Sequence, residues 1–517
     1  MERLPKMIEF VLIIATACIA GSVLTPLMRL IARKSGLIDY PDGRRKLHLQ
    51  PIALGGGLAV FAATLVGIAG AFAYRPSLID GAQSSFFWGL FGSSLFIVGV
   101  GLVDDRYHLR GRQKLLGQIV AVSILIASGL IVRNVKIFEW NIELGLLAIP
   151  FTMFWLLGAI NALNLIDGLD GLAGGVGVIL SLAIAGMACL TVHEFDAIVA
   201  VALCGALLGF LIYNLPPASI YLGDAGSMLI GLLLGALAMH SSLKTAASVA
   251  LMAPTVIWAI PILDVGMAIL RRKLTGRSIY ETDRGHLHHC LLRRGFSSRM
   301  TLFWIGLFCA VTATGALVSV ARQNEWMAVI SAVAVFGTLV VTRMFGYAEC
   351  VLLGGRLKSV FSSLIPKPNR TAGTQASPVH SRLTGTRDWD ELWETLTEYA
   401  EHFDLSSVQL NVNLPALNEE YHVNWNRRDR GPVRQQWTTD IPLIARGVTV
   451  GRLRISGNSI EGSICSWMGD LIAGLKPFEI QMLALVSDQM GDSVFQEPHR
   501  QEAVPFLVET NVGQAVI

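Results

Sequence analysis

Long apolar stretches, each bounded by a short polar connection, alternate along the first two thirds of the chain. A stretch of about 20 apolar residues can cross the hydrocarbon core of a membrane as a helix. The first stretch is too long for the apolar core of a signal peptide, so we interpret it as a membrane helix. The pattern predicts about eleven such helices, at residues 8–30, 52–74, 86–103, 115–132, 144–160, 172–192, 197–213, 227–239, 246–270, 300–320 and 326–346.

The composition supports a membrane protein. The 517 residues are 53% hydrophobic and 15% charged, and the mean hydropathy is +0.54, whereas soluble domains carry about 25% charged residues. The net charge of +3 is too small to suggest a nucleic-acid-binding protein. The seven cysteines are scattered and form no Cys-x-x-Cys pair, which is typical of buried apolar residues and not of a disulfide framework.

Lysine and arginine concentrate in alternate connections. The connections after the first, third and ninth stretches are rich in both, and the intervening connections carry few. Because cytoplasmic loops carry an excess of Lys and Arg, we expect the odd-numbered connections in the cytoplasm, with the N-terminus outside and the C-terminus inside. The polar connections at 161–171 and 214–227 contain no Lys or Arg, yet the alternation places them on the same side.

The composition changes after about Tyr347. Ser, Thr, Pro and Gly predominate in much of the segment 351–386, which is typical of a linker. Beyond it, DWDELWETLTEYAEHF and the segment 477–494 are predicted helices, whereas SSVQLNVNL, EYHVNWNR and IPLIARGVTVGRLRIS alternate as strands. We therefore predict an all-α polytopic membrane domain at 1–350, a linker at 351–386 and a cytosolic α+β domain at 387–517. A sensor or interaction module and a domain for assembly are equally compatible with this last part.

Two adjacent carboxylates, Asp104 and Asp105, end the third apolar stretch. A carboxylate at the C-terminus of a helix opposes the helix dipole, so this position has an electrostatic cost. A solvated pair balanced by Arg106 would be a purely structural explanation, but the cost favours a functional one.

A row of polar side chains with a spacing of three residues follows the fifth stretch, at Asn161, Asn164, Asp167 and Asp170. At this spacing the side chains are expected to share one face of a tight turn or helix. Hard oxygen ligands of this kind suit Mg²⁺. Helix capping would explain one aspartate but not the whole row.

The segment Gly-Asp-Ala-Gly-Ser opens the eighth stretch and contains Asp224. Glycines allow a ligand to approach the backbone, and a helix N-terminus attracts phosphate. The carboxylate would repel a bare phosphate but suits one that is carried by a metal. Shortly before it, Asn214 is a candidate to offer its amide to a nucleobase or sugar; a simple helix cap with glycine turns is the alternative.

A His-x-His-His run, formed by His286, His288 and His289, follows Arg284. No partner lies at zinc spacing and the neighbouring arginines would repel a cation, so the run favours a polyanion such as a sugar pyrophosphate over zinc. Lys46 and His48 precede the second stretch, where they are positively charged anchors and candidates to hold a lipid phosphate.

Carboxylates for a divalent metal, cations for phosphate and glycine turns thus gather at one edge of a membrane bundle. This combination predicts phosphoryl transfer between a soluble nucleotide and a membrane lipid. A transporter or flippase would be expected to place its polar groups in mid-membrane. A scaffold with an inactive membrane half would not need the complete set of motifs.

The motifs Asp-Asp, NxxNxxDGxDGLA, GDxGS and HxHH, in this order over roughly residues 8–346, resemble the polyprenyl-phosphate N-acetylhexosamine-1-phosphate transferases of glycosyltransferase family 4. The bacterial undecaprenyl-phosphate N-acetylglucosaminyl-1-phosphate transferase branch is the most similar. The resemblance implies a Mg²⁺-dependent enzyme, with Mn²⁺ as a second option, in the bacterial inner membrane. It would transfer N-acetylglucosamine-1-phosphate from UDP-N-acetylglucosamine to undecaprenyl phosphate, release UMP, and start a cell-envelope polysaccharide such as that of lipopolysaccharide. Another UDP-N-acetylhexosamine would leave the chemistry unchanged.

By the same resemblance, Asn164 and Asp224 would ligate the metal, and Asp104 and Asp105 would be the catalytic pair, on the cytoplasmic face. The implied partners are the two substrates and membrane lipid, without nucleic acid, and a homodimer is compatible with the family pattern. The substrate-binding residues would be Lys46, His48, Lys114, Asp167, Asp170, Asn214, Arg284, His286, His288 and His289.

Overall fold

The chain divides into two compact units, one formed by Met1–Ala268 with Asp283–Phe345 and the other by Ile269–Thr282 with Gly346–Ile517. The computed structural model describes residues 3–40, 51–78, 84–245, 248–274, 285–347, 349–350, 353, 379–384, 388–403, 405–414, 419–427, 436–445, 448–458, 475 and 478.

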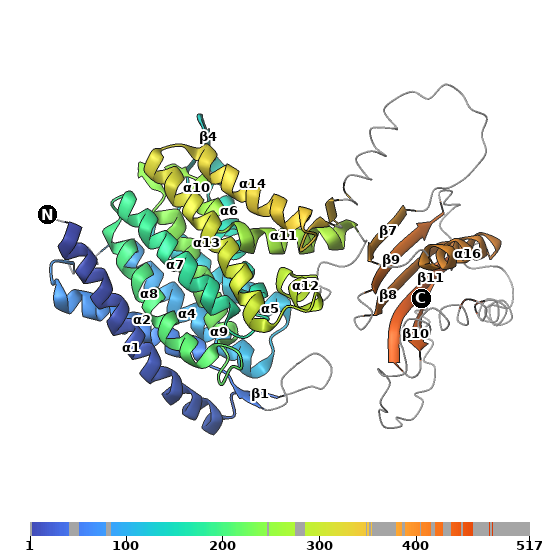
Figure 1. Ribbon diagram of the computed structural model, residues 1–517, viewed down its shortest axis with the longest axis horizontal. Coiled ribbons are helices and arrows are strands. Elements are labelled where there is room, and N and C mark those ends of the chain that lie inside the picture. The colour runs from blue at the N-terminus through green and yellow to red at the C-terminus, as the bar shows by residue number, and fades with distance from the viewer. Residues whose placement is uncertain are drawn as a thin grey trace, which may run out of the picture. The chain divides into compact units, whose positions relative to one another are not determined.

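The first unit is a bundle of helices (Figure 1). Within the described residues, eight helices are long and apolar enough to cross a membrane. The bundle consists of α1 (Arg3–Ser35), α2 (Gly56–Tyr74), α4 (Ser85–Tyr107), α5 (Gly111–Ala127), α6 (Ala148–Ile166), α7 (Leu172–Leu190), α8 (Glu194–Asn214), α9 (Gly223–His240), α10 (Met252–Ile257), α11 (Ala259–Leu274) as far as Ala268, α12 (Leu287–Arg293), α13 (Ser298–Arg322) and α14 (Glu325–Val341).

Eight of the eleven predicted stretches correspond to these eight membrane-length helices, and the other three do not. Two of them form shorter helices, α5 and α14, of 17 residues each. The third, at 246–270, is broken, because α10 ends at Ile257 and α11 begins at Ala259. Pro261 explains the break, since it has no backbone N–H to bond the carbonyl of Ile257 four residues earlier. The prediction of one continuous helix there is therefore wrong.

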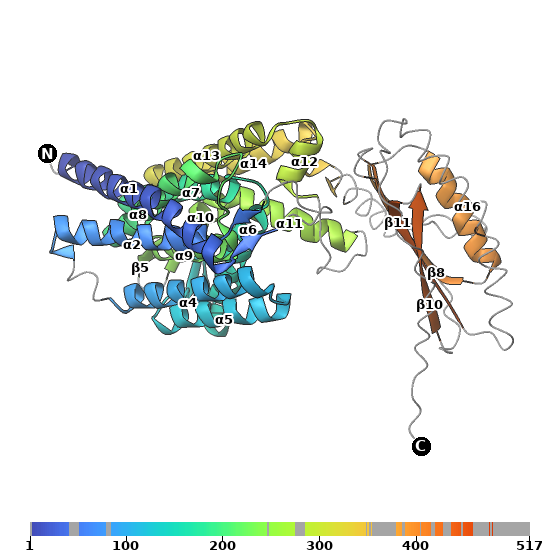
Figure 2. The same ribbon diagram turned by 90° about the horizontal axis from the view of Figure 1, so that it is seen from below.

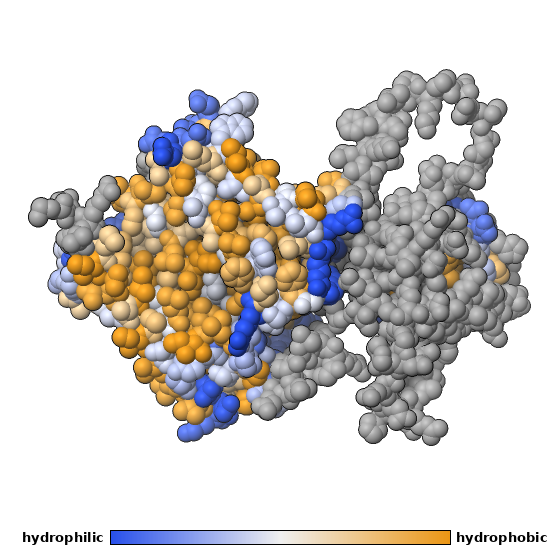
Figure 3. All heavy atoms as spheres, viewed as in Figure 1, coloured by the Kyte–Doolittle hydropathy of each residue, from blue (hydrophilic) through white to orange (hydrophobic). Residues whose placement is uncertain are grey.

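The bundle is most deeply buried along α8 and α9. In their most apolar windows 78% and 83% of the residues are buried, compared with 22% in α1. The outer surface instead carries many apolar side chains, and Figure 3 shows them gathered over the face in view. An extensive apolar exterior is expected of helices that face lipid.

The connections between successive helices meet at two separate ends of the bundle. The odd-numbered connections contact one another at one end, and the even-numbered connections contact one another at the other end. Ala53, which precedes α2, accepts a hydrogen bond from the backbone of Tyr221, which precedes α9. At the other end, β3 (Asn134–Ile137) pairs in parallel with β6 (Ser248–Ala250) within a four-stranded sheet of order β4-β3-β6-β5. The remaining short strands are β1 (Ile38–Asp39), β2 (Ile52–Ala53), β4 (Trp140–Glu143) and β5 (Leu243–Thr245).

The second unit contains a five-stranded antiparallel sheet, of order β10-β11-β8-β9-β7, with α16 along one face (Figure 2). Buried Trp393 and Leu396 of α16 pack with Val408 and Leu453 of the sheet in one hydrophobic core. The elements are β7 (Val379–Thr384), α16 (Asp388–His402), β8 (Leu405–Leu414), β9 (Glu419–Asn426), β10 (Gln436–Ala445) and β11 (Val448–Asn458).

The helix and strands predicted between residues 388 and 458 are confirmed. However, β7 forms inside the segment predicted as a linker. Its Ser- and Thr-containing sequence gave no signal, because an edge strand obtains its backbone hydrogen bonds from its neighbour, here β9. The second predicted helix, at 477–494, lies outside the described residues except for Phe478.

Glycine allows α4 and α9 to come together at one point. A Cβ added at Gly101 of α4 would lie 2.2 Å from the Cα of Ala225 in α9, whereas a Cβ at Gly99 of the same helix would meet nothing within 4 Å.

We therefore predict that Gly101→Ala lowers the free energy of unfolding by about 1–3 kcal/mol through overpacking. Gly99→Ala is the matched control and should not lower it. Thermal unfolding of the purified variants measures both, and equal midpoints would contradict this close approach.

Candidate active site

Lys114, in the first turn of α5, joins carboxylates from two other helices. Its Nζ lies 3.0 Å from Oδ2 of Asp104 and 2.7 Å from Oδ1 of Asp224. Asp104 belongs to the last turn of α4 and is 4% exposed, and Asp224 is the second residue of α9. The other oxygen of Asp104 accepts the N–H of Leu109 at 2.8 Å. The structure thus brings together three predicted site residues around one ammonium group.

Asp105 caps the start of α9. Its Oδ1 accepts the N–H of Asp224 at 2.8 Å, and its Oδ2 accepts the N–H of Ala225 at 3.4 Å. A carboxylate is stabilised at a helix N-terminus, so the cost that Asp105 has at the C-terminus of α4 is offset at α9. The preceding residue must be glycine: Gly223 has φ of 74°, and a Cβ there would lie 2.5 Å from Oδ2 of Asp105.

The row of four polar residues divides between different partners. The amide of Asn164 donates to Oδ1 of Asp224 and, at 3.0 Å, to the hydroxyl of Ser227. The amide of Asn161 donates instead to Oε1 of Gln118 at 2.9 Å. Oδ2 of Asp170 accepts the backbone N–H of Ala218 at 2.9 Å. The two asparagines belong to α6 and the two aspartates to the turn after it, because α6 ends at Ile166.

Asp167, in the turn after α6, lies in an excess of negative charge. Burial, and then the charges of Asp224, Asp105 and Asp170, raise the pKa of Asp167 well above its usual range. A divalent cation would relieve this repulsion.

The side chains of this cluster could supply some, but not all, of the ligands of a Mg²⁺ ion. Within the described parts of the chain, no three His, Cys, Asp or Glu side chains are arranged to hold a metal ion. Mg²⁺ is commonly held by one or two carboxylates together with waters and substrate phosphates. The oxygens of Asp104 and Asp224, which already face a shared cation, with the amide of Asn164 beside them, match that donor set.

Asn214 holds two connections together. Its Oδ1 accepts the N–H of Gly171 at 3.0 Å, and its Nδ2 donates to the carbonyl of Ile220 at 2.9 Å. The side chain is buried, at 4% exposure. Its oxygen and one of its two amide N–H groups are thus engaged within the protein, and the contact with a nucleobase or sugar stays a prediction.

The His-x-His-His run borders the turn that contains Asp167. His288 is 2% exposed, and its Nε2 has no hydrogen-bond partner among the described residues. This nitrogen points at Gly168, where a Cβ would lie 2.7 Å away. Burial, and then the neighbouring His289, lower the pKa of His288 to about 3. The ring of His289 lies beside it, with 4.1 Å between the ring centroids.

Sequence reasoning missed Asp264, which lies in α11. Its Oδ2 is 3.0 Å from Nδ1 of His286, and its Oδ1 accepts the N–H of Leu287 at 2.7 Å. The available signal was an acid inside the apolar segment AIPILDVGM, since an ionisable residue in such a segment is a candidate functional residue. Three predicted site residues, Lys46, His48 and Arg284, lie outside the described residues.

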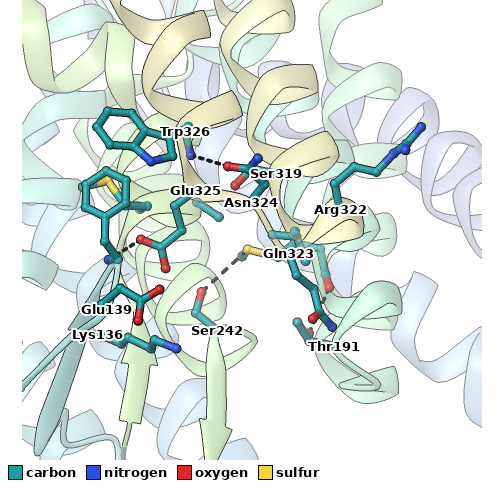
Figure 4. A pocket seen from close by; sticks show the side chains of 15 residues that line it. Lys136, Glu139, Thr191, Ser242, Ser319, Arg322, Gln323, Asn324, Glu325 and Trp326 are labelled. Carbon is teal, nitrogen blue, oxygen red and sulfur yellow. Dashed lines mark hydrogen bonds between the residues drawn. The ribbon is translucent and has the colours of Figure 1, made fainter.

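A cavity of about 630 Å³ lies away from this cluster, at the end where the even-numbered connections meet (Figure 4). Lys136, Glu325 and Trp326 are among the residues that line it, and none of the predicted site residues does. The predicted site residues that the structure describes lie at the opposite end, around Lys114.

Comparison with known proteins places this cluster in a family. Residues 87–242, which include nearly all of α4, the helices α5 to α9 and most of the carboxylates above, match the model of "Glycosyl transferase family 4". A probable undecaprenyl-phosphate N-acetylglucosaminyl 1-phosphate transferase of Bacillus subtilis (strain 168) is 32% identical over 315 residues, which is 60% of this chain and 86% of that protein. The chain belongs to glycosyl transferase family 4. It is therefore a multi-pass membrane enzyme of the polyprenyl-phosphate sugar-1-phosphate transferase superfamily.

Two further relatives of this family 4 transferase come from other bacteria. The decaprenyl-phosphate N-acetylglucosaminephosphotransferase of Mycolicibacterium smegmatis (strain ATCC 700084 / mc(2)155) is 34% identical over 361 residues, 65% of this chain and 88% of that protein. The undecaprenyl-phosphate alpha-N-acetylglucosaminyl 1-phosphate transferase of Yersinia pestis is 30% identical over 292 residues, 55% of this chain and 77% of that protein.

The buried His288 makes the stability of this transferase depend on pH. Its pKa is about 3 in the fold and 6.5 when unperturbed, so the unfolded chain binds the extra proton between these values. The contribution of His288 to the free energy of unfolding is therefore complete above pH 6.5 and is lost as the pH falls toward 3. The loss is at most about 1.4 kcal/mol per pH unit. We predict that the midpoint of thermal unfolding falls less steeply below pH 6.5 in His288→Gln than in the wild type. Parallel curves would contradict the buried, unpartnered ring.

Proposed function

We propose that this protein transfers N-acetylglucosamine-1-phosphate from UDP-N-acetylglucosamine to undecaprenyl phosphate, releasing UMP and starting a cell-envelope polysaccharide. The names of the relatives from Bacillus subtilis and Yersinia pestis support this lipid and this sugar. The observation that carries the proposal is the cluster of Lys114, Asp104 and Asp224 at one end of the bundle, beside His288 and its turn.

We also propose that this end faces the cytoplasm of the bacterial inner membrane. The basic residues concentrate in the odd-numbered connections, and cytoplasmic loops carry such an excess. A soluble nucleotide-sugar would then reach the cluster directly. The N-terminus would lie outside the cytoplasm and the C-terminal unit inside it, with α5, α14 and the α10–α11 pair completing eleven crossings.

In the proposed reaction, an oxygen of the lipid phosphate attacks the sugar-linked phosphorus of the nucleotide. A new P–O bond forms, the bond between the two phosphates breaks, and UMP leaves with the electron pair. The second pKa of a phosphate monoester is near 6, about as in a phosphorylated side chain, so the attacking group is already largely ionised and needs no strong base. The larger task for the protein is to bring two anions together.

Each residue of the cluster has a part in that task. Asp224, Asn164 and Asp104 would hold Mg²⁺, which when bound neutralises pyrophosphate charge and stabilises the leaving phosphate. Lys114 keeps the two carboxylates of the cluster together. Asp105 fixes the first turn of α9 and so the position of Asp224. The imidazoles of His286 and His288 would contact the sugar or the pyrophosphate.

The two aspartates should respond differently to substitution. Asp224→Ala removes the carboxylate that Lys114 and Asn164 share, so we predict that activity falls by at least about 100-fold and no longer responds to Mg²⁺. Asp105→Asn keeps an oxygen that can accept one N–H of α9, and it should retain binding of UDP-N-acetylglucosamine better. Activity and nucleotide-sugar binding of both variants, measured over a range of Mg²⁺ concentrations, test this. An Asp224→Ala enzyme with wild-type activity and Mg²⁺ response would refute the metal assignment.

The reaction itself is tested with membranes, undecaprenyl phosphate and a panel of labelled UDP-sugars. We predict that UMP is released with UDP-N-acetylglucosamine in the presence of Mg²⁺ and not after chelation. Release with a different UDP-N-acetylhexosamine would keep the chemistry and change the substrate. Release with no sugar of the panel would overturn the proposed function.

A further inference from the structure

Asp264 makes both of its hydrogen bonds to the segment where α12 begins. One oxygen lies 3.0 Å from Nδ1 of His286, and the other accepts the N–H of Leu287 at 2.7 Å. Asp264 is 2% exposed and His286 is 5% exposed, so water does not compete strongly for these contacts. The carboxylate therefore fixes both the ring of His286 and the backbone position from which α12 continues.

The contact also fixes which nitrogen of His286 carries the proton. A carboxylate oxygen accepts hydrogen bonds, so the contact requires a proton on Nδ1 of His286 and leaves Nε2 as the ring nitrogen that faces away from Asp264. Carboxylates that hold the far nitrogen of a functional histidine act in this way at many sites, where they set the tautomer and the orientation of the ring.

The position of His288 depends on the same contact. His288 is the second residue of α12, directly after the Leu287 whose N–H is held by Asp264. The rings of His286 and His288 are nearly parallel, with an angle of 9° between their planes and 6.0 Å between their centroids. The unpartnered Nε2 of His288 faces Gly168, in the turn that carries Asp167.

From these contacts we infer that Asp264 is a positioning residue for nucleotide-sugar recognition. It holds His286 with its proton on Nδ1 and anchors the start of α12, so that His288 lies against the turn at Gly168. Asp264 does not touch the substrate and acts through the two histidines. The identity of the ligand rests on the proposed function. The proton position on His286 and the hydrogen bond of Asp264 to Leu287 do not depend on it.

Asp264→Asn removes the negative charge that faces His286 but keeps an oxygen that can bond the start of α12. The amide oxygen can still accept the N–H of Leu287, so α12 should keep its start, but the amide NH₂ would donate to Nδ1 of His286. The ring proton should then move to Nε2. Nitrogen-15 NMR of histidine-labelled protein, with the signal assigned by His286→Gln, measures this without any substrate. A wild-type ring with its proton on Nε2, or the same tautomer in both proteins, would overturn the inference.

Kinetics provide the second measurement. Loss of a hydrogen bond to a charged group corresponds to about a 10- to 100-fold change in affinity. We expect Asp264→Asn to raise KM for UDP-N-acetylglucosamine by that factor and to leave KM for undecaprenyl phosphate unchanged. Asp264→Glu, which keeps the charge, should recover part of the loss. Equal KM values in the wild type and Asp264→Asn would overturn the positioning role.

A matched control exists at the other end of α9. There the buried Asp196 lies 2.7 Å from Nδ1 of His240 and is 1% exposed. Asp196→Asn removes a buried charge of the same kind and should not change either KM; an increase equal to that of Asp264→Asn would show a general packing effect and overturn the inference. If the wild type releases UMP from no sugar, the proposed function fails, and the ring-nitrogen measurement still decides the role of Asp264.

Discussion

Negative charge held where the end of α4 meets the start of α9 is the constraint on which the cluster around Lys114 depends. Asp104 and Asp105 stand at the C-terminus of α4, where the helix dipole disfavours them. Each is compensated from elsewhere: Asp104 by the ammonium group of Lys114, and Asp105 by the first N–H groups of α9. The first compensation requires α5 to approach the end of α4, and the second requires the C-terminal end of α4 to lie against the start of α9. The electrostatics of the cluster therefore dictate the packing beneath it.

Small residues make that packing possible. Gly101 of α4 lies against Ala225, and a Cβ at Gly57 of α2 would lie 2.2 Å from the backbone nitrogen of Gly226. Two helices, α2 and α4, thus converge on the first turn of α9, next to Asp224. The surrounding polar residues stabilise this arrangement. Asn214 and Asp170 tie the turn after α6 to the segment before α9, and Asp264 anchors α12 beside it.

The sequence predicted which residues gather at this end of the bundle better than it predicted their hydrogen-bond partners. Apolar length located most helices, and the motifs located Asp104, Asp224, Asn164 and His288, which the structure brings to one end. The partner of Asp105 lies on α9, more than a hundred residues away, so the spacing within α4 could not reveal it. The two partners of Asn214 could not be predicted for the same reason, since both belong to turns whose approach depends on the fold.

Two other differences have local causes. The break before α11 was visible in the sequence at Pro261, but the high hydropathy of the stretch concealed it. Asp264 was overlooked because a single acid in an apolar stretch has no motif around it, although its burial makes a partner necessary. By contrast, β7 had no local signal, because the strand depends on the hydrogen bonds that β9 offers.

We propose that the carboxylates around Lys114 form the cation site of a phosphoryl transferase. Binding of Mn²⁺ to the purified protein, followed by electron paramagnetic resonance, tests it without substrate or turnover. We predict one site per chain in the wild type, competed by Mg²⁺ and lost when Asp104 and Asp224 are both replaced by Asn. Unchanged Mn²⁺ binding in that double variant would contradict the account.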